Sequence, residues 1–275
     1  MVVTLAQSLE PTRPLPNFPT EGGSPNVTAS GNSTTQTDAP KFALATPQGH
    51  WQGTAPAALQ TIAASVGNHP NPLTTEYLYE PESAIYHGSE GDVVRSSALY
   101  LLHPVNQALS LLTHDSVYCL SEATAHNVRS DITYYRGARP FAVVEFKRRG
   151  VIRLAEFRAA VKAITPATSE ANLVASASAH NSTHHTFFDG NSTILIKQAA
   201  SYAINHRTRY VALFNWDFMV LCHFTNLNHA ASKNTLIANG VGNYCEMEVI
   251  PFAESHRMRP SLLGFLTKAY NDTPP

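Results

Sequence analysis

Apolar and β-forming residues run almost unbroken through the middle of the chain, from Phe141 to Lys147. A stretch this apolar is typical of a central strand that is covered on both faces. It ends in the alternating sequence Glu145-Phe146-Lys147, and alternation along a strand places Glu145 and Lys147 on one face. Ionised groups on such a strand are costly unless they are paired, bind a metal or open onto a cleft, so this pair is the first candidate for chemistry.

Similar patterns predict the neighbours of this strand. Residues 116–123 and 131–136 read as strands, and Gly137 and Pro140 turn the chain into the strand at 141–147. Three strands in such close succession predict a β-meander. Residues 210–215 and 218–224 predict a further pair of strands joined across Trp216 and Asp217.

Helical periodicity surrounds the strands. Ser89 suits an N-cap, and Glu90 and Asp92 suit a first turn, for a helix that Pro104 is expected to interrupt before a second helix over 105–112. More helices are predicted over these ranges: 55–66, 153–164, 194–206 and 260–270. The polar stretch 165–192 predicts an inserted loop.

The order of these elements is helix, three strands, helix, strand. It predicts an α/β fold with a small mixed central sheet flanked by helices. Residues 1–50 are dominated by Pro, Gly, Ser, Thr, Asn and Gln, and such a stretch cannot bury enough apolar surface to offset its ordering entropy. We therefore expect a disordered tail over 1–50 and one domain over 51–275.

Composition narrows the class of protein. The net charge of −1 argues against a chain that is basic throughout, and the three cysteines are too scattered for a disulfide framework or a zinc motif. His180, His184 and His185 lack a Cys or carboxylate at ligand spacing and predict a polar loop. With neither a signal-peptide pattern nor an apolar run of membrane length, the expectation is an intracellular protein, nuclear or cytoplasmic, without a membrane partner.

Asp131 is the second candidate for chemistry. It lies at the start of the second meander strand, where a hairpin can bring its carboxylate to the same point as that of Glu145. Two carboxylates, with water and phosphate oxygens, form the hard-oxygen set that Mg²⁺ prefers. A nearby lysine such as Lys147 can orient or deprotonate a water and stabilise charge that develops on phosphorus.

This arrangement resembles the PD-(D/E)XK nuclease superfamily, whose restriction-endonuclease-like core runs αβββαβ with an acid on the second strand and Glu-x-Lys on the third. Gln198 and Tyr202, four apart on the next helix, look like the Gln-xxx-Tyr motif of RecB-like members. Glu90 matches an additional acid that many members carry on the leading helix. Ser130 stands where the family name has a proline.

The resemblance implies a metal-dependent nuclease that hydrolyses phosphodiester bonds of DNA. Asp131, Glu145 and Glu90 would hold Mg²⁺ or Mn²⁺, Lys147 would position the attacking water, and Gln198 and Tyr202 would support the site. Eight basic and two acidic residues lie between Arg136 and Lys162. Such a flank suits backbone phosphates, with these contacts expected: Arg136, Arg148 and Arg149.

Simpler interpretations stay open for each residue. Asp131 alone suits a turn, Glu90 a first helical turn, and Gln198 and Tyr202 the polar edge of a helix. Arg148 and Arg149 suit a solvated turn. Two other functions are also consistent with the pattern: a silent nuclease-fold module that binds nucleic acid or protein, and a toxin or effector nuclease delivered by the tail.

Overall fold

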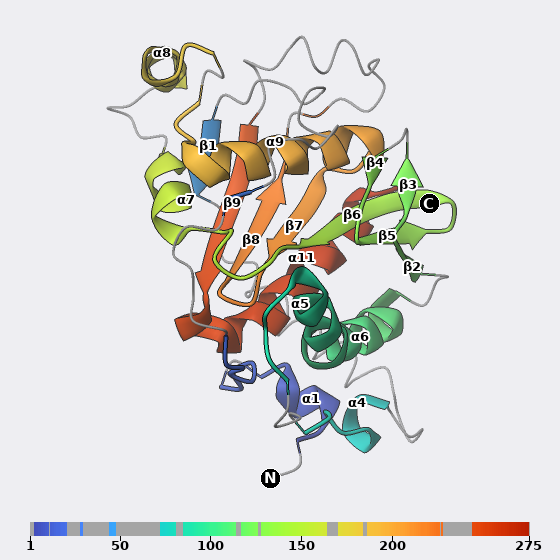
Figure 1. The fold of residues 1–275 in the computed structure, drawn as a ribbon. Coiled ribbons are helices and arrows are strands. Elements are labelled where there is room, and N and C mark those ends of the chain that lie inside the picture. The colour runs from blue at the N-terminus through green and yellow to red at the C-terminus, as the bar shows by residue number, and fades with distance from the viewer. Residues whose placement is uncertain are drawn as a thin grey trace.

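The computed structural model describes residues 3–10, 12–20, 28–29, 44–47, 72–80, 85–113, 117–125, 128–163, 170–183, 186–225, 227 and 244–274. Its main strands are β1 (Leu44–Pro47), β2 (Val117–Ser121), β5 (Ile132–Arg136), β6 (Arg139–Phe146), β7 (Tyr210–Phe214), β8 (Phe218–His223) and β9 (Tyr244–Pro251). They form one mixed sheet in the order β1-β9-β8-β7-β6-β5-β2. A small ribbon of β3 (Thr124–Ala125) and β4 (Val128–Arg129) extends from the β2–β5 pair (Figure 1).

The pairing confirms the predicted meander and the predicted hairpin. β2, β5 and β6 pair antiparallel in succession, β7 pairs parallel to β6, and β8 returns antiparallel to β7. At the hairpin Trp216 has a positive φ of 70°. The sheet is larger than predicted because β9 and β1 continue it beyond β8.

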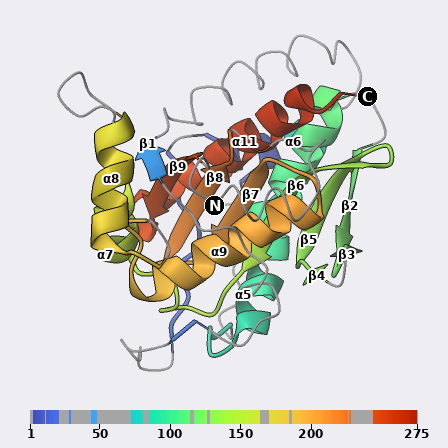
Figure 2. The same cartoon turned by 90° about the horizontal axis from the view of Figure 1, so that it is seen from above.

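Helices cover both faces of the sheet, so the fold is α/β with a mixed sheet between helical layers (Figure 2). One face packs against α5 (Glu90–Ser97), η2 (Ala98–Leu102), α6 (His103–Thr113) and α11 (Met258–Asp272). The other packs against α7 (Leu154–Ala160) and α9 (Gly190–Asn205). The remaining helices are α1 (Leu5–Ser8), α4 (Pro72–Thr75), α8 (Glu170–His180) and η4 (Phe252–Arg257). None of the helices in these ranges has the length and apolar character needed to cross a membrane.

The predicted interruption at Pro104 is wrong, because α5, η2 and α6 follow one another without a break. Ser89 caps this helix as predicted. The turn before Pro104 is π-helical, and such a turn accommodates the proline ring. Proline has no N–H for the carbonyl four residues earlier, that of Tyr100. The Nε of Arg259 donates to that carbonyl instead, at 2.7 Å.

The prediction of an inserted loop over 165–192 is also wrong for the described part of that range. It contains all of α8, and α9 begins at Gly190. Asp189 and Ser192 form a capping box at the start of α9. His180 Nε2 donates a hydrogen bond to Asp189 Oδ2 at 2.8 Å. His184, His185 and the helix predicted over 55–66 lie outside the described residues.

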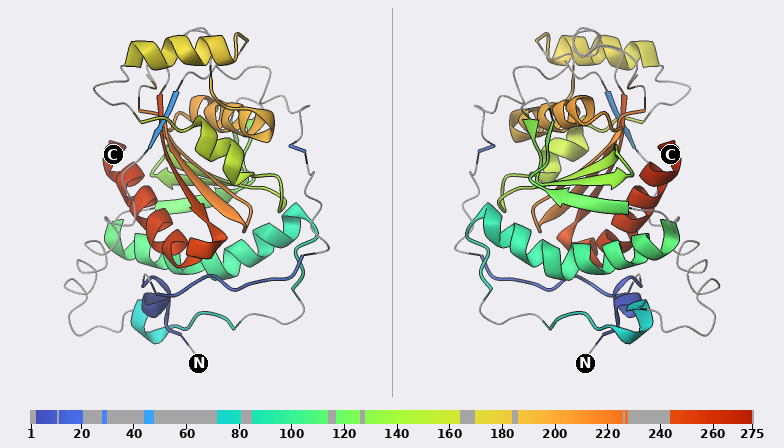
Figure 3. Two further views of the ribbon diagram at one scale, coloured as in Figure 1. Left: turned by 90° about the vertical axis from the view of Figure 1, so that its left-hand side faces the viewer. Right: turned by 90° about the vertical axis from the view of Figure 1, so that its right-hand side faces the viewer.

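The N-terminal segment, residues 3–20, packs on the core, so the prediction of a disordered tail over 1–50 is wrong for these residues. Its apolar side chains are buried in the same core as α6 and α11: Leu5, Leu9, Leu15 and Phe18. Side chains from distant elements bind its carbonyls. Arg259 donates to Ser8 O at 3.1 Å, and Trp216 Nε1 donates to Pro16 O at 3.0 Å. The segment lies on the side of α5 and α6 away from the sheet (Figure 3).

A core role for the N-terminal segment predicts a large effect of Leu9→Ala. Leu9 is fully buried, so truncation should lower the free energy of unfolding by about 2–5 kcal/mol. Urea denaturation followed by tryptophan fluorescence measures this. The neighbouring exposed residue supplies the control, since Glu10→Ala should change stability by less than about 0.5 kcal/mol. Equal stability of both variants would restore the disordered tail.

Candidate functional site

Glu145, the penultimate residue of β6, is the centre of the candidate site. Its side chain is almost fully buried, with 4% of the residue exposed. Oε1 accepts hydrogen bonds from Lys147 Nζ at 2.6 Å and Tyr202 Oη at 2.6 Å. Gln198 Nε2 donates to the same oxygen at 3.3 Å. In Figure 1 the chain that leaves β6 passes between α5 and α9, so helices from both layers reach this point.

Asp131 converges with Glu145, as the hairpin spacing predicts. The register pairs Ile132 with Val144, which places Asp131 beside Glu145. The backbone N–H of Asp131 donates to Glu145 Oε2 at 3.1 Å, and the backbone N–H of Phe146 donates to Asp131 Oδ2 at 2.7 Å. These reciprocal bonds lock the start of β5 to the end of β6.

Glu90 supplies a third carboxyl group. It is the first residue of α5, and the backbone N–H of Arg148 donates to its side chain. The charges of Lys147 and Asp131 both influence its proton affinity, so it faces the same cluster. Glu90 therefore both begins a helix and joins the candidate site.

Gln198 and Tyr202 lie one turn apart on α9 and both point at Glu145. Gln198 Nε2 also donates to Tyr202 Oη at 2.7 Å. These contacts argue against the simpler interpretation of a polar helix edge. Small and apolar residues along α9 pack in the core on this side of the sheet and so fix the helix that presents the pair: Leu195, Ile196, Ala199, Ala200, Ala203 and Ile204.

The carboxyl groups of the cluster are hard to ionise. Burial raises the pKa of Glu145 to about 7; the Lys147 ammonium opposes this rise and the Asp131 charge adds to it. Burial is also the main cause of the raised pKa of Asp131 and of Glu90. Raised pKa values that arise from burial beside specific charge partners are typical of functional sites.

Lys147 shows the opposite balance. Burial, the largest single effect, lowers the pKa of Lys147. The charges of Glu145 and then Glu90 raise it by more in total, so the net shift of the pKa is upward. Lys147 is therefore an ammonium ion at neutral pH. It is suited to position a nucleophile or stabilise negative charge, and unsuited to accept a proton. Burial and the Glu145 charge also raise the pKa of Tyr202, which keeps its phenol as a neutral donor.

The structure separates the three arginines that the sequence grouped as phosphate contacts. Arg148 is exposed and directly follows Lys147. Arg149 is instead bound to Asp217 Oδ1, at 2.8 Å from Nε, and its Nη1 donates to Phe18 O at 2.8 Å. It holds the N-terminal segment in place, so its prediction as a phosphate contact is corrected.

The prediction of Arg136 as a phosphate contact is also corrected. It ends β5, the strand that Asp131 precedes, and so lies at the far end of that strand from the cluster. Its Nη1 donates to Thr273 O at 2.8 Å and to Tyr270 O at 3.3 Å. Its guanidinium also lies 4.2 Å from the centre of the Tyr270 ring. It closes the end of α11 and is not part of the site.

Asp217 is a supporting residue that the sequence analysis missed. Besides binding Arg149 it accepts the backbone N–H of Gly150 at 3.2 Å, and thereby fixes the turn after Lys147. A signal was present: β6 and β7 are parallel, and the turns that follow parallel neighbours meet at one edge of the sheet.

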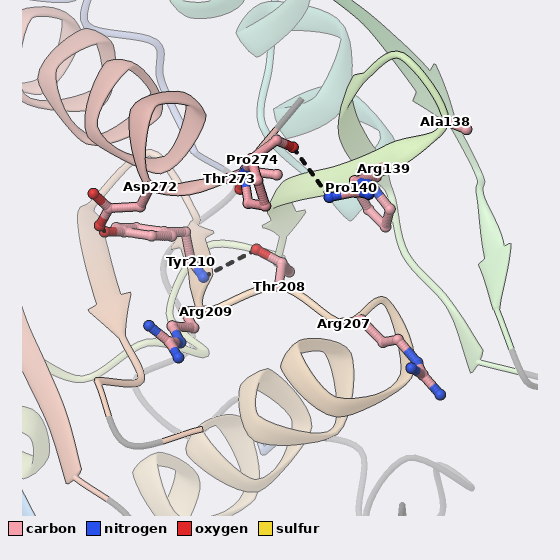
Figure 4. Close-up of a pocket in the computed structure, with 10 residues that line it drawn as sticks. All are labelled: Ala138, Arg139, Pro140, Arg207, Thr208, Arg209, Tyr210, Asp272, Thr273 and Pro274. Carbon is pink, nitrogen blue, oxygen red and sulfur yellow. Dashed lines mark hydrogen bonds between the residues drawn. The ribbon is translucent and has the colours of Figure 1, made fainter. Parts of the chain in front are cut away.

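A pocket of about 470 Å³ lies away from the cluster, at the opposite end of β6 and β7 (Figure 4). Its lining residues are Ala138, Arg139, Pro140, Arg207, Thr208, Arg209, Tyr210, Asp272, Thr273 and Pro274. It contains no member of the cluster around Glu145. The chemistry of that cluster is therefore separate from this pocket.

The donor chemistry of the cluster suits a hard divalent cation, because three carboxyl groups meet there. The spacing does not provide a ready coordination shell: in the described part of the chain, no three His, Cys, Asp or Glu side chains are arranged to hold a metal ion. Glu145 Oε1 already accepts three hydrogen bonds. In this arrangement the Lys147 ammonium pairs with the Glu145 carboxylate.

Comparison of the chain with protein-family models, with curated proteins and with solved structures found no match. Any function must therefore be argued from the geometry of the cluster and from the sequence motifs.

The raised pKa of Glu145 predicts a pH-dependent stability. The folded protein keeps a proton that the unfolded chain releases near pH 4.5, so stability should fall as pH rises from about 4.5 to about 7. The expected fall is about 3 kcal/mol. The glutamine in Glu145→Gln cannot titrate, so the free energy of unfolding of this variant, measured by urea denaturation across that pH range, should not show this fall. If plots of the free energy of unfolding against pH ran parallel for the wild type and Glu145→Gln, Glu145 would ionise in its ordinary range.

Proposed function

We propose that the protein is a metal-dependent nuclease that hydrolyses phosphodiester bonds of DNA, with a restriction-endonuclease-like core. The observation that carries the proposal is the meeting of six side chains around the buried Glu145 carboxyl group, from the start of β5, the end of β6, the start of α5 and α9: Glu90, Asp131, Glu145, Lys147, Gln198 and Tyr202. The order of α5–α6, β2, β5, β6, α9 and β7 along the chain also supports it. It is the αβββαβ order that the resemblance to PD-(D/E)XK nucleases implies.

The residues of the cluster divide into three roles in this proposal. Lys147, as an ammonium ion, positions the attacking water and stabilises negative charge on the phosphate. Tyr202 and Gln198 fix the Glu145 carboxylate by hydrogen bonds. Arg148, exposed beside Lys147, contacts a backbone phosphate.

Mg²⁺ or Mn²⁺ would be held by Asp131, Glu145 and Glu90, and would supply a polarised water and neutralise phosphate charge. For this the Lys147 ammonium must give up its bond to Glu145 Oε1, since that oxygen already has three donors. Lys147 would then be available to a substrate phosphate. The same side chain would thus serve either as the counter-ion of Glu145 or as a contact to phosphate.

A silent nuclease-fold module is the second candidate, and one observation favours it. In the described residues the acids are not spaced to hold an ion, and Lys147 satisfies the centre of the cluster without a metal. Such a module would bind nucleic acid without cleaving it.

Cleavage of circular DNA with Mg²⁺ or Mn²⁺ tests the proposal, with a single-stranded circle and a duplex plasmid as the two substrates. The wild-type protein should cleave at least one of them, and Lys147→Met should lower that rate at least about a hundredfold, because it removes the ammonium and keeps the length of the side chain. Asp131→Asn should have an effect of at least that size. Glu10→Gln, which alters an exposed acid far from the cluster in the sequence, should keep the full rate.

Calorimetric titration with Mn²⁺ identifies the metal site separately. The wild-type protein should bind the ion, and the double variant Asp131→Asn/Glu145→Gln should not. Binding of DNA without any cleavage by the wild-type protein, in either metal, would replace the nuclease proposal by the silent module.

A further inference from the structure

Two tyrosines stack at the edge of the sheet, outside the cluster around Glu145. The rings of Tyr118 on β2 and Tyr135 on β5 lie 5.1 Å apart between centres and within 6° of parallel. The two residues are direct cross-strand partners. Tyr118 is 43% exposed, a high value for an aromatic side chain that is already stacked on one ring face.

The stacked pair lies on the same face of the sheet as the acid cluster. Thr133 pairs with Val143, which packs against α9. Because every second residue of a strand points to the same face, Tyr135 on β5 and Glu145 on β6 also point to the face that α9 covers. Asp131 also belongs to this series. The distance along the strand from Asp131 to Tyr135 is about 13 Å, which is a few nucleotides of a single strand.

This part of the face is open to solvent. β2 is its last strand, and four of its five residues are exposed. Leu120, opposite Thr133, is 47% exposed and extends the apolar surface beside Tyr118. Together Tyr118, Tyr135 and Leu120 form what we term the aromatic edge.

Positive charge continues from the aromatic edge. Pro140 pairs with Tyr135 and also lines the pocket of Figure 4. Three exposed arginines surround that pocket: Arg139, Arg207 and Arg209. Its one lining carboxylate, Asp272, is bound by Lys268 Nζ at 2.7 Å and by Tyr210. A phosphate chain that leaves the aromatic edge therefore meets cationic side chains.

We propose that the aromatic edge is a base-stacking site for single-stranded nucleic acid, which it directs along β5 to the cluster around Glu145. The inference rests on the proposed function and names its substrate as single-stranded. Unpaired bases extend the tyrosine stack, and the arginines at the pocket bind the phosphates beyond it. A duplex keeps its bases stacked inside and cannot use this surface in the same way. Single strands accordingly bind more tightly than duplexes of equal length.

Fluorescence anisotropy with a labelled oligothymidine of about 12 nucleotides tests this, using the full chain in EDTA so that no cleavage occurs. Tyr118→Ala should raise the Kd about tenfold or more, and Tyr118→Phe should restore it to within about twofold, because the ring does the stacking. Tyr77→Ala is the matched control, since Tyr77 is 56% exposed and lies outside the aromatic edge; it should bind like the wild type.

An abasic oligomer of the same length is the second probe. It offers phosphates without bases, so wild-type protein and Tyr118→Ala should bind it equally. Equal affinity of these two proteins for the oligothymidine would overturn the proposal. So would a dimer in sedimentation velocity that Tyr118→Ala dissociates without any change in oligothymidine affinity, because the edge would then pair with a second copy.

The binding assay separates this inference from the proposed function. Tyr118-dependent binding of the oligothymidine by a protein that cleaves nothing would support the stacking site and reject the nuclease. Cleavage of plasmid DNA by a protein whose oligothymidine affinity does not depend on Tyr118 would support the nuclease and reject the stacking site.

Discussion

The burial of the Glu145 carboxylate is the constraint on which the arrangement of the site depends. A buried charge is costly unless donors surround it, and here they come from the residue before β5, the residue after β6 and α9. The pairing register of β5 with β6 and the position of α9 over the sheet must both be correct for these bonds to form. The meander, the crossover that contains α9 and the parallel strand β7 must therefore all be in place before the Glu145 carboxylate has its donors.

The elements that carry the site are those that the sequence predicts well. Glu145, Lys147 and Asp131 lie on or beside strands of clear apolar pattern, and Gln198 and Tyr202 lie four apart on a helix, so alternation and helical spacing suffice to group them. The arginines are different. Arg136 and Arg149 are next to these motifs in sequence, but their partners, Thr273 and Asp217, are distant along the chain. Local pattern contains no information on such partners.

The misjudged regions have a similar cause. In the N-terminal segment the apolar residues are sparse and lack a period, and their burial depends on carbonyl contacts with Arg259 and Trp216. β9 does show alternation of acids with Cys245, Met247 and Val249, which was a usable signal for a strand. At Pro104 the rule that proline ends a helix fails because a π-helical turn and Arg259 together compensate for the missing N–H.

Arg259 also has a consequence for the order of folding during synthesis. It lies 251 residues after Ser8, whose carbonyl it binds, and it contacts the carbonyls of Arg13 and Pro14 as well. Residues 3–20 are synthesised long before α11, so they cannot reach this partner until α11 has been made. Contacts of such sequence separation form late and slowly. The nascent chain must therefore hold the carbonyls of Ser8, Arg13 and Pro14 without their Arg259 contacts until α11 has been made.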